Sequence, residues 1–159
     1  MAIIETLIAT AIEGIFLLAI KKIKKLINIK PEALRKLKAV YREICANRTV
    51  LAKTAGKNGE GAPHGTQAFV DLAKGLSNAE TAPLYKERKT VRRSRIVKGG
   101  NKREQINRVQ YALNYTIRQI DELKALAKQK TVKRLRLSVR LRTLARHLEE
   151  LEKILRPVK

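Results

Sequence analysis

The stretch LSVRLRTLARHLEELEKIL, residues 137–155, decides the fold of this chain. Its leucines recur at alternating spacings of four and three, the pattern of a helix that packs one apolar seam against other helices: Leu137, Leu141, Leu144, Leu148, Leu151 and Leu155. We predict a helix that stops at Pro157. Residues 135–142 also alternate strictly between apolar and polar, as a half-buried strand does. We favour the helix, because the leucine seam continues in register beyond the alternating part.

A second apolar stripe lies upstream and predicts a partner helix. Its members also recur three and four apart: Ile106, Val109, Leu113, Ile117, Ile120, Leu123 and Ala127. Asn101 can cap this helix, with Glu104 three residues later as in a capping box. Only residues 128–131 separate the two stripes, so we expect the helices to fold back on each other. A basic antiparallel hairpin is therefore predicted over residues 104–156.

Another helix is predicted over residues 31–54, because Pro31 and Glu32 suit a first helical turn. Its apolar stripe has one polar interruption, at Arg48: Leu34, Leu37, Tyr41, Ile44 and Leu51. Glycine and proline crowd into residues 56–65 and predict a loop, after which residues 67–76 can form a short helix. We assign residues 55–103 to a loop-rich linker with a basic arm.

The start of the chain predicts a hydrophobic and amphipathic helix over residues 1–28. Residues 3–20 are almost wholly apolar and a basic run follows at once, the reverse of the order in a signal peptide. As a helix this segment would be about 28 Å long, close to the thickness of a bilayer core. The apolar residues of this membrane or assembly helix are Ile4, Leu7, Ile8, Ile12, Ile15, Phe16, Leu18 and Ile20.

Glu5 and Glu13 fall in one polar sector of that helix and leave three alternatives open. The helix spans a membrane, lies in the membrane interface, or is buried in a protein assembly. The predicted fold class is thus mainly α, with an N-terminal hydrophobic helix, a second helix, a loop-rich middle and a C-terminal antiparallel helical hairpin.

The charge of the chain points to a polyanionic partner. Its 159 residues include 36 Lys and Arg against 14 Asp and Glu, a formal net charge of +22. Nucleic acid and anionic lipid both present dense phosphate that such side chains neutralise. Arginine predominates at the candidate sites and aromatic residues are few, which favours contact with the backbone of duplex or structured nucleic acid over single-strand stacking.

Two basic segments are the predicted nucleic-acid sites. Nine of the eighteen residues 86–103 are basic and one is acidic. Residues 133–146 lie on the predicted C-terminal helix and contain no acid. Their like charges on adjacent turns repel one another, and bound phosphate would neutralise them. The predicted contact residues are Lys86, Arg88, Lys89, Arg92, Arg93, Arg95, Lys98, Lys102, Arg103, Lys133, Arg134, Arg136, Arg140, Arg142 and Arg146.

Catalysis has little support in the sequence. His64 and His147 are the only histidines, and no carboxylate pair lies at metal-ligand spacing with them. Arg142 lies five residues before His147, a spacing that resembles the Arg-x4-to-6-His motif of the HEPN family of helical ribonucleases. The resemblance implies RNA cleavage, but it covers six residues only. We predict a protein that is not an enzyme and needs no cofactor or metal.

The sequence therefore predicts a structural protein that binds nucleic acid without sequence specificity and forms homo- or hetero-oligomers. Tethering or packaging a genome beside a membrane or shell, as small virion proteins do, is one setting for it. We expect it in the cytoplasm or inside a virion, with the basic body on the cytoplasmic-equivalent side of any membrane. The alternative is a coiled-coil subunit of a larger protein or membrane assembly, whose basic surface meets an acidic partner or lipid headgroups.

Overall fold

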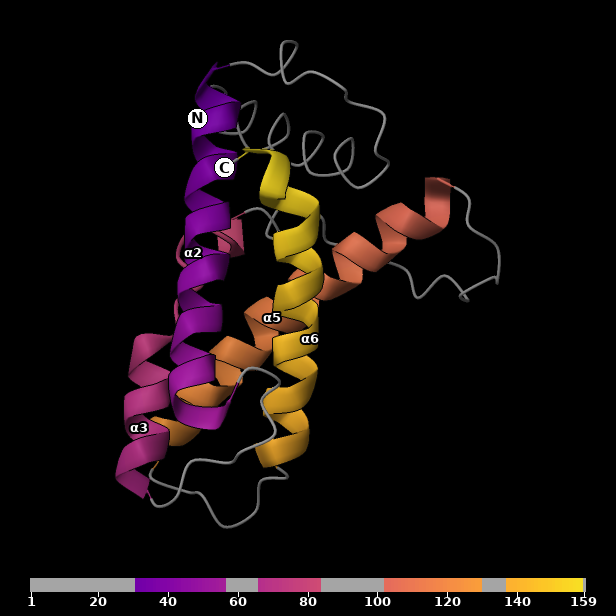
Figure 1. The fold of residues 1–159 in the computed structure, drawn as a ribbon. Coiled ribbons are helices and arrows are strands. Elements are labelled where there is room, and N and C mark those ends of the chain that lie inside the picture. The colour runs from indigo at the N-terminus through magenta and orange to yellow at the C-terminus, as the bar shows by residue number, and fades with distance from the viewer. Residues whose placement is uncertain (1–30, 57–65, 84–101, 130–136, 159) are drawn as a thin grey trace.

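The computed structural model describes residues 31–56, 66–83, 102–129 and 137–158. Within these ranges the regular structure is entirely helical (Figure 1): α2 Pro31–Ala55, α3 Thr66–Gly75, α5 Lys102–Lys128, α6 Leu137–Leu155 and the short 3-10 helix η2 Arg156–Val158. The predicted N-terminal helix, with its apolar residues Ile4 to Ile20, lies outside the described residues. None of the described helices is both long and apolar enough to cross a membrane.

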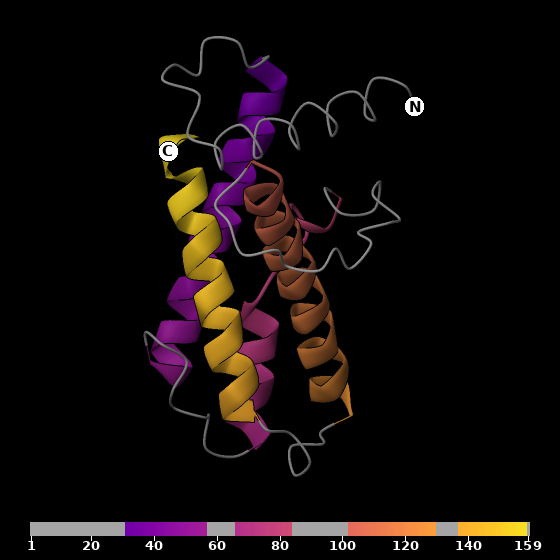
Figure 2. The same ribbon diagram turned by 90° about the vertical axis from the view of Figure 1, so that its right-hand side faces the viewer.

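The helices pack into one bundle around α6. Helix α6 contacts both α2 and α5, while α3 packs against α5 and α2. Figure 1 shows α2 and α6 running in opposite directions, and Figure 2 shows α5 beside α6, also in opposite directions. The antiparallel pairing of α5 and α6 confirms the predicted hairpin.

The stripes predicted on α5 and α6 form much of the core. On α2, Leu37, Ile44 and Leu51 are buried as predicted, whereas Leu34 and Tyr41 are only partly buried and Ala33 and Val40, off the predicted stripe, take their place. Every leucine of the α6 seam, from Leu137 to Leu155, is buried. On α5 the predicted stripe is buried from Val109 to Leu123. Helical structure over residues 137–142 resolves the choice between helix and strand in favour of the helix there. Burial of these aliphatic side chains is the main force that holds the helices together.

Helix α2 ends where the sequence predicted. Gly56 has a φ of 77°, the left-handed conformation that glycine adopts readily after the last turn of a helix. Its N–H donates to the carbonyl oxygen of Ala52 at 3.2 Å, which satisfies one of the last free carbonyls. Arg48, the polar interruption in the α2 stripe, forms an ion pair with Glu152 of α6.

The segment predicted as loop-rich contributes to the core. Helix α3 lies within it, close to the short helix expected over residues 67–76. Phe69, Leu72 and Leu76 are fully buried, and Phe69 has the largest of the fully buried side chains. This part of residues 55–103 is therefore an integral layer of the bundle.

A buried polar network fastens the segment after α3 to α2. The carboxyl group of Glu43 accepts hydrogen bonds from the Ser77 hydroxyl at 2.7 Å, from the Thr81 N–H and hydroxyl, both at 2.8 Å, and from the Glu80 N–H at 3.0 Å. One turn later, Asn47 accepts from the Ser77 N–H at 2.8 Å and donates to the Ser77 carbonyl oxygen at 2.6 Å.

The same segment also reaches α5. Asn78 donates from its side-chain amide to the carbonyl oxygen of Ile117 at 3.3 Å and to the carboxyl group of Asp121 at 2.8 Å. Glu80 forms an ion pair with Lys36 of α2. Residues 76–83 thus bridge two helices that are far apart in the sequence.

Candidate nucleic-acid interface

The structure describes three of the predicted contact side chains, those of Arg140, Arg142 and Arg146 on α6. Lys102 and Arg103, which the sequence placed in the arm, lie in the first turn of α5. The helix thus begins directly after Asn101, as the predicted cap requires, and two residues before the predicted boundary of the hairpin. The other predicted contact residues lie outside the described ranges: Lys86, Arg88, Lys89, Arg92, Arg93, Arg95, Lys98, Lys133, Arg134 and Arg136.

Arg142 and Arg146 lie on the outer face of α6. Both are exposed, and because they are four positions apart their side chains leave the helix within about 40° of each other. No described residue forms an ion pair with either of them. Two turns further along, Lys153 is paired with Glu149 at 2.9 Å, so among the described residues the positive charge without an ion-pair partner is confined to the first half of this face.

Arg140 has a structural partner. Its guanidinium group donates to Glu122 of α5 at 2.9 Å, and both side chains remain partly exposed. A partly exposed ion pair of this kind contributes at most about 1 kcal/mol. Arg140 therefore links the two helices of the hairpin and has less free charge for a phosphate than Arg142 and Arg146.

An aromatic cluster lies at the seam between α5 and α6. The ring centroid of His147 is 4.6 Å from that of Tyr115 and 5.4 Å from that of Tyr111, the latter in an edge-to-face arrangement. His147 is buried, and neither of its ring nitrogens has a hydrogen-bond partner among the described residues. Burial lowers the pKa of its imidazole, and the nearby charge of Arg146 lowers it further.

The structure does not bring the Arg142 and His147 side chains to one face. Five residues along an α-helix correspond to a rotation of about 140°. Arg142 consequently points to solvent, whereas His147 packs between the two helices. The two side chains that carry the resemblance to the HEPN motif therefore do not lie together within this bundle.

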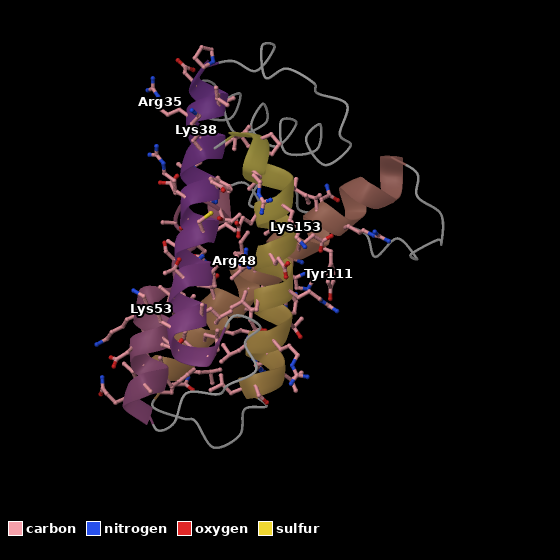
Figure 3. The ribbon with its side chains drawn as sticks, in the orientation of Figure 1. Arg35, Lys38, Arg48, Lys53, Tyr111 and Lys153 are labelled. Carbon is pink, nitrogen blue, oxygen red and sulfur yellow. The ribbon has the colours of Figure 1, made fainter. Side chains whose placement is uncertain are left out.

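Tyr111 differs from the other tyrosines of the described ranges. Its side chain is 59% exposed, whereas Tyr41 and Tyr115 are partly buried. Figure 3 shows it on the α5–α6 flank, away from Arg35 and Lys53 on α2. All three lie within helical patterns of the sequence, where a tyrosine is more often a core or flanking residue than a stacking one. The signal for Tyr111 was its position two residues from both Val109 and Leu113, which takes it off the apolar stripe.

Two arginines on α5 share this flank and were not predicted. Arg108 and Arg118 are exposed. At 100° per residue Arg118 lies within about 20° of Tyr111, and Arg108 within about 60°. No described residue forms an ion pair with either arginine. The α5–α6 face, defined here by Arg108, Tyr111, Arg118, Arg142 and Arg146, therefore combines an exposed aromatic ring with four cations that have no ion-pair partner within the described ranges.

Most of the excess charge lies outside the described bundle. The ranges with described side chains, residues 31–56, 67–83, 108–129 and 137–158, contain 16 Lys and Arg and 9 Asp and Glu, a net charge of +7. The rest of the sequence contains 20 Lys and Arg and 5 Asp and Glu, a net charge of +15, which completes the total of +22. The bundle is thus a moderately basic body whose flanking segments carry a much denser charge.

Within the described part of the chain no three His, Cys, Asp or Glu side chains come together as a metal site. In this described part, the exposed cations of the α5–α6 face that lack an ion-pair partner are the strongest candidates for a binding site. No protein-family model, curated protein or solved structure matches this chain.

Proposed function

We propose that this is a structural, non-enzymatic protein that binds nucleic acid through phosphate contacts, without sequence specificity. The basic arm and the outer face of α6 supply those contacts. The observation that carries the proposal is the pair Arg142 and Arg146, exposed on one helical face with no ion-pair partner among the described residues. Tethering of the nucleic acid to a membrane or shell by the N-terminal segment is part of the same proposal.

The arrangement of acids on α6 supports this function. A helix that only needed a soluble outer face would interleave acids with its arginines, because like charges four residues apart destabilise a helix by a few tenths of a kcal/mol. On α6 the acids Glu149, Glu150 and Glu152 come only after the arginines, and two of the three form ion pairs. Phosphate groups bound to Arg142 and Arg146 would remove that repulsion and release counterions.

Salt dependence of binding tests the proposal. We expect the full chain to bind a fluorescently labelled duplex with an affinity that falls log-linearly as salt rises from about 50 to 300 mM. The double variant Arg142→Ala/Arg146→Ala should bind more weakly and lower the slope of that line by about 2, one for each lost phosphate contact. Fluorescence anisotropy titrations at several salt concentrations measure both quantities.

A matched control removes two charges elsewhere. Arg35 and Lys53 are exposed on the α2 flank, so Arg35→Ala/Lys53→Ala should leave the slope close to that of the unmodified chain. An affinity that does not change with salt, or no binding at low salt, would reject the proposal. In that event binding to an acidic protein or to anionic vesicles becomes the better explanation for the charge.

A further inference from the structure

The Tyr111 ring is exposed but held in place. It packs edge-to-face on His147 at 5.4 Å and lies 6.3 Å from the ring centroid of Tyr115. His147 itself is buried between α5 and α6, so it provides a rigid support. An aromatic side chain that is fixed on one side and 59% exposed on the other loses little conformational freedom when a second flat ring stacks on it.

Three exposed arginines lie on the same two helices as this ring. Arg108 and Arg118 lie along α5 on either side of Tyr111, about 15 Å apart at 1.5 Å per residue. Arg146 precedes His147 on α6, and its charge is close enough to lower the pKa of the imidazole. Of the described acids on these two helices, Glu122, Glu149 and Glu152 form ion pairs, Asp121 accepts a hydrogen bond from Asn78, and Glu150 is partly buried. A negatively charged ligand with a flat ring would match this surface.

We propose that Tyr111 stacks on an unpaired nucleobase, while Arg108, Arg118 and Arg146 contact the flanking phosphates. The inference rests on the proposed nucleic-acid function. It adds single-stranded nucleic acid to the duplex or structured nucleic acid whose phosphates Arg142 and Arg146 contact under that proposal. In a duplex the faces of the bases are occupied by their neighbours, so Tyr111 cannot reach them. Stacking on a tyrosine accepts every base, which agrees with binding that lacks sequence specificity.

The experiment compares single and double strands on the full chain. Oligothymidylate of about 20 nucleotides and a duplex of the same length are titrated in parallel. Tyr111→Ala should lower the affinity for the single strand by about 5- to 100-fold, the range for loss of one stacked base, and change duplex affinity less than about twofold. Val139→Ala is the control and should leave both affinities unchanged. Among the described residues Val139 is the other large exposed hydrophobic side chain, at 53%.

A second variant gives a direct signal. The chain contains no tryptophan, so Tyr111→Trp introduces the only indole. We expect this variant to keep its affinity for the single strand and its emission to be quenched when the strand binds, as base stacking requires.

The results separate this inference from the function on which it rests. If neither nucleic acid binds at low salt, the proposed function fails and this inference fails with it. If both bind, but Tyr111→Ala affects them equally or not at all, or Tyr111→Trp is not quenched, then Tyr111 is not a stacking residue. The phosphate-binding function would remain supported in that case.

Discussion

Glu43 is the residue on which the segment after α3 depends. It is 8% exposed, and its two oxygens accept from two backbone N–H groups and two hydroxyls. Glu43→Ala would remove the acceptor of all four donors. The N–H and hydroxyl of Thr81 are buried, so each would cost about 1–3 kcal/mol if water cannot reach it. We expect a total loss of about 2–5 kcal/mol in the free energy of unfolding, measured by urea denaturation.

The neighbouring exposed position provides the comparison. Arg42→Ala should change the free energy of unfolding by no more than about 0.5 kcal/mol, because Arg42 is exposed and no described residue pairs with it. Equal, small effects of Glu43→Ala and Arg42→Ala would mean that the network around Ser77 and Thr81 does not stabilise the fold.

His147 should make stability depend on pH. Its pKa is below the ordinary value of 6.5 in the folded state, first because the ring is buried and second because Arg146 is close. The unfolded chain therefore takes up a proton at a higher pH than the folded chain does. Stability should be unaffected above about pH 7 and should fall as the pH drops through 6.5, by about 1.4 kcal/mol for each tenfold reduction in proton affinity.

Thermal unfolding between pH 8 and pH 5 measures this effect. The variant His147→Phe keeps an aromatic ring against Tyr111 and Tyr115 but cannot titrate, so its unfolding temperature should lose this part of the pH dependence. A profile for His147→Phe that matches the unmodified chain would show that other groups cause the decline.

At the scale of elements, the contact between α2 and α3 needs a glycine. A Cβ atom built on Gly75 would lie 2.8 Å from Cγ1 of Val50, closer than carbon atoms approach in proteins, and valine is too stiff to move aside. We predict that Gly75→Ala destabilises the protein by about 1–3 kcal/mol, although alanine is the better helix former.

A second substitution that shortens the Val50 side chain tests whether the clash causes the loss. In the double variant Gly75→Ala/Val50→Ala the added methyl group has space, so the loss should be smaller than the sum of the two single effects. A double-mutant cycle on urea denaturation measures that difference. Additive losses would indicate that the close approach of α3 to α2 is not the reason for glycine at this position.

The elements themselves were largely predictable, because periodicity reports directly on which side of a helix is buried. The leucine seam of α6, the stripe of α5 and the cap at Gly56 each follow from spacing or from a single backbone requirement. Glu43 and Asn47 were not predicted, because a polar residue that faces a loop looks the same in the sequence as one that faces water. The exposed ring of Tyr111 could have been found from its place off the stripe, whereas its contact with His147 depends on the register of two helices.

For the whole molecule, the imbalance of charge should limit stability in dilute buffer. The positive side chains behind the net charge of +22 repel one another, and salt at about 0.15 M screens charges more than about 8 Å apart. We expect the unfolding temperature of the chain without nucleic acid to rise by about 2–4 °C between low salt and 0.15 M potassium chloride, equivalent to about 1 kcal/mol.

Sorbitol at the same osmolarity is the control for this measurement, because it leaves charges unscreened. A fall in unfolding temperature with potassium chloride would mean that attractive pairs such as Arg140–Glu122 outweigh the repulsion. Duplex nucleic acid at low salt should stabilise the chain more than potassium chloride does. A ligand that binds only the folded state raises the free energy of unfolding by RT ln(1 + [L]/Kd), which grows with its concentration above Kd.

The bridge formed by residues 76–83 has a consequence for hydrogen exchange. The amides of Ser77 and Thr81 donate to side chains of α2, so neither can exchange with solvent until those contacts with α2 open. Both should therefore exchange as slowly as amides in the middle of α2, despite lying outside the long helices. The bridge would make α2 and residues 76–83 one cooperative unit, in which local opening of either part requires opening of the other.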